Sequence, residues 1–126
     1  MFAIPPLVLL LGSVALGLLL GLDYLRRVRS KPALVGFHLL MGAAATELIA
    51  MFLRGTPGNS AIPVGPLLQS AAALLGIALL TGLVAPMIGR RSRSTMNIAL
   101  IVHVSASTAG VVLCLLWFAR AAKGLS

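Results

Sequence analysis

The feature that most constrains this chain is a series of four long apolar segments, at about 3–24, 33–54, 67–89 and 95–120. At about 1.5 Å of rise per residue, a helix of about 20 residues crosses the roughly 30 Å hydrocarbon core of a bilayer. Hydrophobic residues make up 60% of the 126 residues and charged residues only 10%, a balance that is not typical of a soluble domain. The sequence therefore predicts a multi-pass integral membrane protein.

Basic residues are concentrated in two of the three links between these segments. The first link carries four of them between Arg26 and Lys31, the third carries three between Arg90 and Arg93, and the link at 55–66 carries none. The positive-inside rule then places the two basic links in the cytoplasm and both termini on the other side. We expect an all-α fold, an antiparallel four-helix bundle that forms a single domain over 1–126, in the bacterial inner membrane.

The net charge of +8 raises the question of a nucleic-acid partner. Because the basic groups lie between apolar segments, they are interpreted as topology signals and lipid headgroup contacts, and nucleic acid is excluded. The single cysteine, Cys114, excludes an internal disulfide and a thiolate-rich metal site. At the last segment, Ser94 or Thr95 is expected as the helix N-cap and Trp117 as an interfacial anchor.

The two histidines, His38 and His103, each lie within an apolar segment. An imidazole at bilayer depth is costly unless it has a partner, so such residues are usually functional. His38 comes seven residues after Lys31 and His103 ten residues after Arg93. Both helices run outward from the cytoplasmic side, which places the two rings roughly 10 to 15 Å into the membrane at nearly equal depth.

Small residues follow each histidine at helical spacing. The series on the second segment is His38, Gly42, Ala45 and Ile49, and that on the fourth is His103, Ser107, Gly110 and Cys114. A flat macrocycle needs such a groove, because bulky side chains would collide with it. We therefore predict one haem b with His38 and His103 as its axial iron ligands, and with the cofactor lined by Gly42, Ala45, Ser107 and Gly110.

Three other interpretations of the histidines stay open. Each ring could bond a backbone or hydroxyl group inside a tight bundle, could be the single axial ligand of a chlorophyll-type pigment, or could bind another metal. The two halves of the chain share a pattern of apolar helix, basic link and helix with one histidine, yet no repeat long enough to indicate duplication is recognised. Equal depth is the observation that favours a shared haem.

The stretch Leu80-Thr81-Gly82-Leu83, followed by a basic link and then His103, is similar to an arrangement found in small membrane cytochromes b. The chain also resembles the haem-bearing anchor subunits of succinate dehydrogenase and fumarate reductase. The resemblance implies an electron-transfer subunit in a respiratory complex, with other membrane subunits and a quinone as partners. Two histidines, where the two-haem cytochromes b have four, allow one bis-histidine site, and the anchor subunits typically have three helices.

Glu47 is the other costly residue, nine positions after His38 and so on the opposite side of the helix. It could carry protons or bond a quinone, or it could pair with Arg54. No catalytic triad, paired carboxylates or nucleotide-binding loop is present, so the chain is at most an electron-transfer subunit of an oxidoreductase. The alternative functions are a non-catalytic accessory or assembly subunit of a membrane complex and a small transporter component that uses Glu47.

Overall fold

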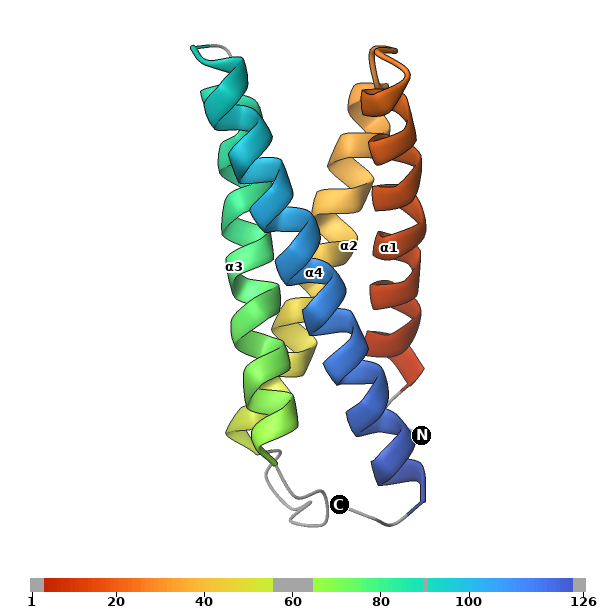
Figure 1. Ribbon diagram of the computed structural model, residues 1–126. Helices are drawn as coiled ribbons and strands as arrows, with labels where there is room; N and C mark the ends of the chain where they lie inside the picture. Colours follow the sequence, from red (N-terminus) through yellow and green to blue (C-terminus); the bar gives the residue numbers. More distant parts are fainter. Residues whose placement is uncertain (1–3, 56–64, 90, 124–126) are drawn as a thin grey trace. The chain divides into compact units, whose positions relative to one another are not determined.

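The computed structural model describes residues 4–55, 65–89 and 91–123, and these form four α-helices. They are α1 (Ile4–Leu25), α2 (Pro32–Arg54), α3 (Pro66–Ile88) and α4 (Arg93–Ala122) (Figure 1). Each helix is long and apolar enough to cross a membrane. The predicted all-α class and the four helices able to span a membrane are therefore confirmed, with helix ends within two residues of those expected.

The start of α4 differs from the prediction. Ser92, not Ser94 or Thr95, is the N-cap: its backbone is extended (φ −149°, ψ 117°) and its side chain accepts a hydrogen bond from the Thr95 backbone N–H at 3.3 Å. A cap must precede the helix and meet an N–H group two or three residues ahead. Ser94 and Thr95 already lie within the first turn of α4, so the helix begins earlier than the sequence indicated.

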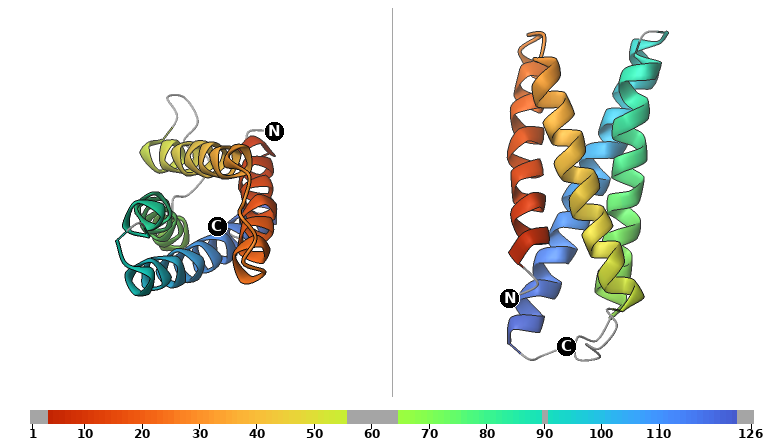
Figure 2. Two further views of the ribbon diagram at one scale, coloured as in Figure 1. Left: turned by 90° about the horizontal axis from the view of Figure 1, so that it is seen from above. Right: turned by 180° about the vertical axis from the view of Figure 1, so that it is seen from behind.

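The chain divides into two compact units, residues 1–48 and 49–126. In the first unit α1 and α2 form an antiparallel hairpin, and the two helices lie side by side (Figure 2). The turn between them is tight because Arg27 adopts a left-handed conformation (φ 57°) and the Val28 N–H donates to the Asp23 carbonyl at 2.9 Å. Ser13 of α1 is buried within this unit.

In the second unit α3 and α4 form another antiparallel hairpin, and the unit also includes the last residues of α2. The buried residues of α3 are spaced three, four, three and then seven positions apart, which places them on one face of the helix; they are Leu68, Ala71, Leu75, Ala78 and Ala85. Gly110 of α4 lies against this face. A Cβ atom on Gly110 would lie 2.9 Å from Leu75 Cγ and 3.3 Å from the Ala71 carbonyl oxygen.

Trp117 is packed inside the second unit. Only 4% of its surface is exposed, and its ring lies 6.4 Å from the ring of Phe52 and 5.0 Å, edge to face, from that of Phe118. Interfacial anchors present an amphipathic ring to the headgroups. The indole is therefore a packing residue, and the predicted interfacial anchor is wrong.

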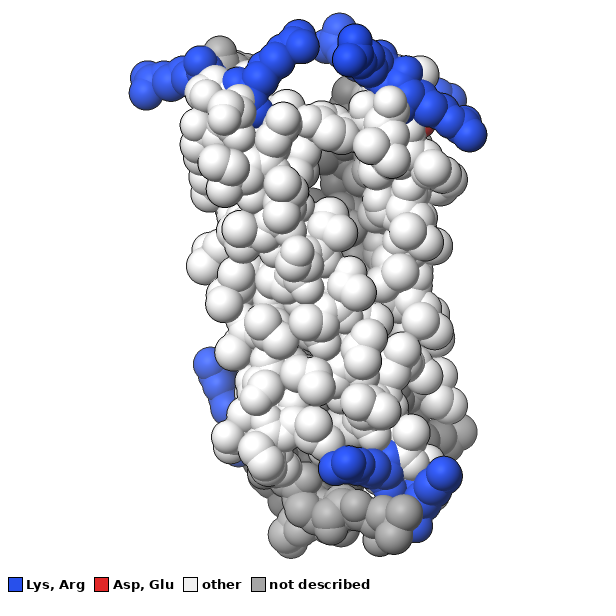
Figure 3. Space-filling model, viewed as in Figure 1, with Lys and Arg blue, Asp and Glu red and all other residues white. Residues whose placement is uncertain are grey.

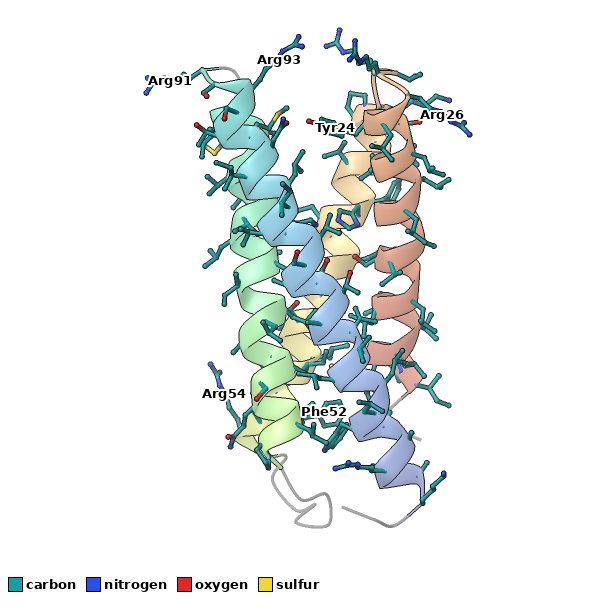
Figure 4. All side chains as sticks on the ribbon, in the orientation of Figure 1. Tyr24, Arg26, Phe52, Arg54, Arg91 and Arg93 are labelled. Atoms are coloured by element: carbon teal, nitrogen blue, oxygen red, sulfur yellow. The ribbon has the colours of Figure 1, made fainter. Side chains whose placement is uncertain are left out.

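Arginine and lysine side chains gather at the ends of the helices. On the face drawn in Figure 3, the middle of each hairpin carries none of them. Arg26 and Arg91 project from the links that follow α1 and α3, and Arg93 projects from the first residue of α4 (Figure 4). This distribution agrees with apolar helices in contact with a lipid bilayer and charged links at its surface.

Candidate functional site

His38 lies in the second turn of α2 and its ring faces α1. Its Nδ1 is 2.9 Å from the Ser13 backbone carbonyl oxygen. A carbonyl oxygen can only accept, so Nδ1 carries the proton and donates it. The Ser13 hydroxyl lies 3.3 Å from the same nitrogen and 3.4 Å from the His38 carbonyl oxygen, so Ser13 holds both the ring and the backbone of His38.

His103 is held in the same way within the second unit. Its Nδ1 donates to the carbonyl oxygen of Ala78 on α3 at 2.7 Å. The Thr81 hydroxyl, which donates to the Ile77 carbonyl at 2.8 Å, also lies 3.1 Å from the Ala78 oxygen. Each histidine therefore bonds the backbone of the preceding helix in its own hairpin, and in both cases the acceptor lies 25 residues earlier in the chain.

A glycine of the preceding helix lies against each histidine ring. A Cβ atom on Gly17 would lie 3.0 Å from His38 Cε1, and a Cβ atom on Gly82 would lie 2.7 Å from both Cε1 and Nδ1 of His103. Carbon atoms in contact are normally about 3.5 to 4.0 Å apart. A side chain at position 82 would force the His103 ring to shift, and one at position 17 would require the His38 ring to give by a few tenths of an ångström.

The carbonyl hydrogen bonds determine which nitrogen can bind a metal. With the proton on Nδ1, the neutral imidazole carries its lone pair on Nε2. Histidines that ligate metals commonly donate their other ring N–H to a backbone carbonyl or carboxylate, which fixes the tautomer and the ring orientation. Both histidines of this chain have that arrangement.

Two of the small residues predicted to line a cofactor, Gly42 and Gly110, lie against the other helix of their own hairpin. A Cβ atom on Gly42 would lie 3.1 Å from the Ser13 hydroxyl, and Gly110 packs against Leu75. Ala45 is fully buried, and the Ser107 hydroxyl donates to the Val104 carbonyl at 3.1 Å. Close helix packing thus accounts for the small size of Gly42 and Gly110.

The sequence did not lead us to predict Ser13, Gly17, Ala78 or Gly82 as contacts of the histidine rings, and Gly82 entered only as part of a resemblance. The sequence nevertheless contains a spacing that relates these residues to one another. Ser13 and Ala78, Gly17 and Gly82, and His38 and His103 form three pairs, each separated by 65 residues. The two hairpins are thus equivalent at these positions, although the sequence analysis recognised no duplication.

Among residues 4–55, 65–89 and 91–123, no group of three or more His, Cys, Asp or Glu side chains converges. Cys114 is buried and Glu47 is exposed. This part of the chain therefore contains no metal site built from three or more such side chains.

No protein-family model matches this chain, and no match was found among the curated proteins or among the solved structures. Its function must therefore be inferred from its own histidines and their surroundings.

Proposed function

We propose that this chain is a b-type cytochrome subunit in which His38 and His103 are the axial ligands of one haem b. The observation that carries the proposal is the hydrogen bond from Nδ1 to a backbone carbonyl, which is made by both histidines. It places the lone pair of each ring on Nε2, the atom that ligates iron in such sites. A haem held by two imidazoles supplies one-electron transfer.

The protein groups divide the work between binding and orientation. His38 and His103 provide the ligating nitrogens, and the carbonyls of Ser13 and Ala78 fix the direction of each ring. A hydrogen bond to the far nitrogen also makes a ligating imidazole more basic. Lining of the macrocycle by Gly42, Ala45, Ser107 and Gly110 belongs to the same proposal.

The proposal includes a topology. The two basic links face the cytoplasm, both termini face the other side, and the four helices form one antiparallel bundle in the bacterial inner membrane. It is supported by the basic residues, which number four in the first link and three in the third. In the same proposal, electrons reach and leave the site through other membrane subunits or a quinone.

The purified protein, supplied with haem during expression, should show an absorption spectrum that sharpens on reduction with dithionite into the bands of a low-spin haem b. Two imidazole ligands fill both axial positions, and this makes the iron low-spin. The measurement is a reduced-minus-oxidised difference spectrum in detergent. A colourless protein despite excess haem contradicts the proposal and favours histidines that only pack the hairpins.

The proposed topology predicts which positions an impermeant maleimide can label in intact cells. In a Cys114→Ala background, Val28→Cys and Ser94→Cys should react only after the cells are permeabilised, because both links lie in the cytoplasm. Both positions are exposed in the structure. Ser60→Cys should react without permeabilisation, and the reverse pattern would invert the proposed orientation.

A further inference from the structure

We infer that Gly17 and Gly82 are positioning residues for the two histidines, each acting by leaving the carbonyl that binds the ring uncovered. The inference rests on the proposed function in one respect: it assumes that the orientation of the rings matters because they ligate a cofactor. It assigns Gly17 and Gly82 a role in orienting the rings, which the proposed function does not include.

Each glycine lies about one helical turn after the residue whose carbonyl accepts the ring N–H. Gly17 follows Ser13 by four residues, and Gly82 follows Ala78 by four. In an α-helix the carbonyl of residue i accepts the N–H of residue i+4, so these two groups lie next to each other along the helix. A side chain on residue i+4 would therefore lie close to a histidine ring whose Nδ1–H binds the same carbonyl.

There is little space between each glycine and the neighbouring histidine ring. At Gly82 a methyl group would lie 2.7 Å from two atoms of the His103 ring, a distance that non-bonded atoms do not adopt. The ring would have to shift, and with it the Nδ1 that now lies 2.7 Å from the Ala78 carbonyl oxygen. At Gly17 the corresponding distance is 3.0 Å, so His38 would be displaced less.

The same set of residues occurs in both hairpins. The acceptor, the glycine, the histidine and one arginine recur after 65 residues, the arginines being Arg26 and Arg91. Two other glycines of these helices have open space beside them, whereas Gly12 of α1 lies against the Met41 side chain. A Cβ atom on Gly21 of α1 or on Gly76 of α3 would meet no described atom within 4 Å. Those two glycines are matched controls, because they test the effect of an added methyl group without a ring beside it.

The experiment uses the full chain in detergent, labelled with 15N at histidine and prepared without added haem. Long-range 1H–15N correlation spectra distinguish Nδ1–H from Nε2–H tautomers. Wild type should show both histidines as Nδ1–H. Gly82→Ala should abolish this signature for His103 and keep it for His38, Gly17→Ala should weaken it for His38 alone, and Gly21→Ala and Gly76→Ala should match wild type.

The unaffected histidine in each variant reports that the protein is still folded. If Gly82→Ala disrupts both signals, the looser contact of Gly17→Ala provides the second test, and loss of both signals there too would mean that the glycines support folding in general and would overturn the inference. An unchanged His103 spectrum in Gly82→Ala, or an Nε2–H tautomer in wild type, would also overturn it.

A second arm loads the same proteins with haem and compares their spectra and reduction potentials. Gly82→Ala should shift the potential or raise the high-spin fraction, whereas Gly76→Ala should do neither. If the tautomers respond as expected but no variant binds haem, the glycines position the rings and the proposed cytochrome function fails. The same variants therefore test the positioning role of the glycines and the proposed cytochrome function separately.

Discussion

Replacing His103 with alanine should abolish the low-spin haem b spectrum, and replacing His38 should do the same. Loss of a group that only supports a metal ligand typically costs about 10- to 100-fold in affinity, and loss of the ligand itself should cost more. A variant that retains haem through the remaining histidine should be high-spin, because one axial position is then open. The measurement is the reduced spectrum at equal protein and haem concentrations.

The fold should survive these substitutions. The Ala78 carbonyl keeps its intrahelical N–H donor when the His103 ring is removed. Ser105→Ala, at an exposed position of α4, is the matched control and should leave the spectrum unchanged. Added imidazole should restore the low-spin spectrum to His103→Gly, and low-spin spectra in both alanine variants would sink the axial-ligand assignment.

Gly110→Leu should lower the free energy of unfolding of the protein by about 1–3 kcal/mol, the usual cost of overpacking a tight contact. The new side chain would begin 2.9 Å from Leu75 Cγ and 3.3 Å from the Ala71 carbonyl oxygen, and a backbone oxygen cannot swing aside. The helices α3 and α4 must then move apart. Unfolding by added SDS in mixed micelles, without haem, measures the effect.

Gly76→Leu is the control for that substitution. It adds the same side chain to α3, at a glycine where a Cβ atom would meet no described atom within 4 Å. We expect its free energy of unfolding to stay within about 0.5 kcal/mol of wild type, as for substitutions away from packed features. Equal destabilisation by both leucines would show that Gly110 is not a special contact between α3 and α4.

The helices could be predicted from the sequence because their signal is local. A run of about 20 apolar residues bounded by arginines or prolines specifies a spanning helix whatever else the chain does. The histidines were also evident, since ionisable residues stand out in such runs. Fold class and the two ring positions therefore needed no knowledge of packing.

The partners of the rings could not be predicted in this way. Which carbonyl meets a ring depends on the register between the two helices of a hairpin, and the intervening turn sets that register. In the first hairpin this turn contains Arg27 in a left-handed conformation, which residues other than glycine and asparagine seldom adopt. Nothing in the basic link indicates it.

Trp117 illustrates the same limit of local signals. The basic residues Arg120 and Lys123 place it near a membrane surface, which favours an interfacial anchor. It is buried in the structure, and one of its ring contacts is Phe52 at the end of α2, which is 65 residues away in the chain. A contact between such distant residues belongs to tertiary structure and leaves no trace in the residues around the tryptophan.

Both ring hydrogen bonds connect residues only 25 positions apart, across a single short link. Contacts this local form quickly and need no later part of the chain. During synthesis, α1 and α2 can therefore pair and fix His38 while α3 and α4 are still being translated. The biogenesis of the protein should proceed two helices at a time, with each hairpin leaving the insertion machinery as a folded pair rather than as separate spans.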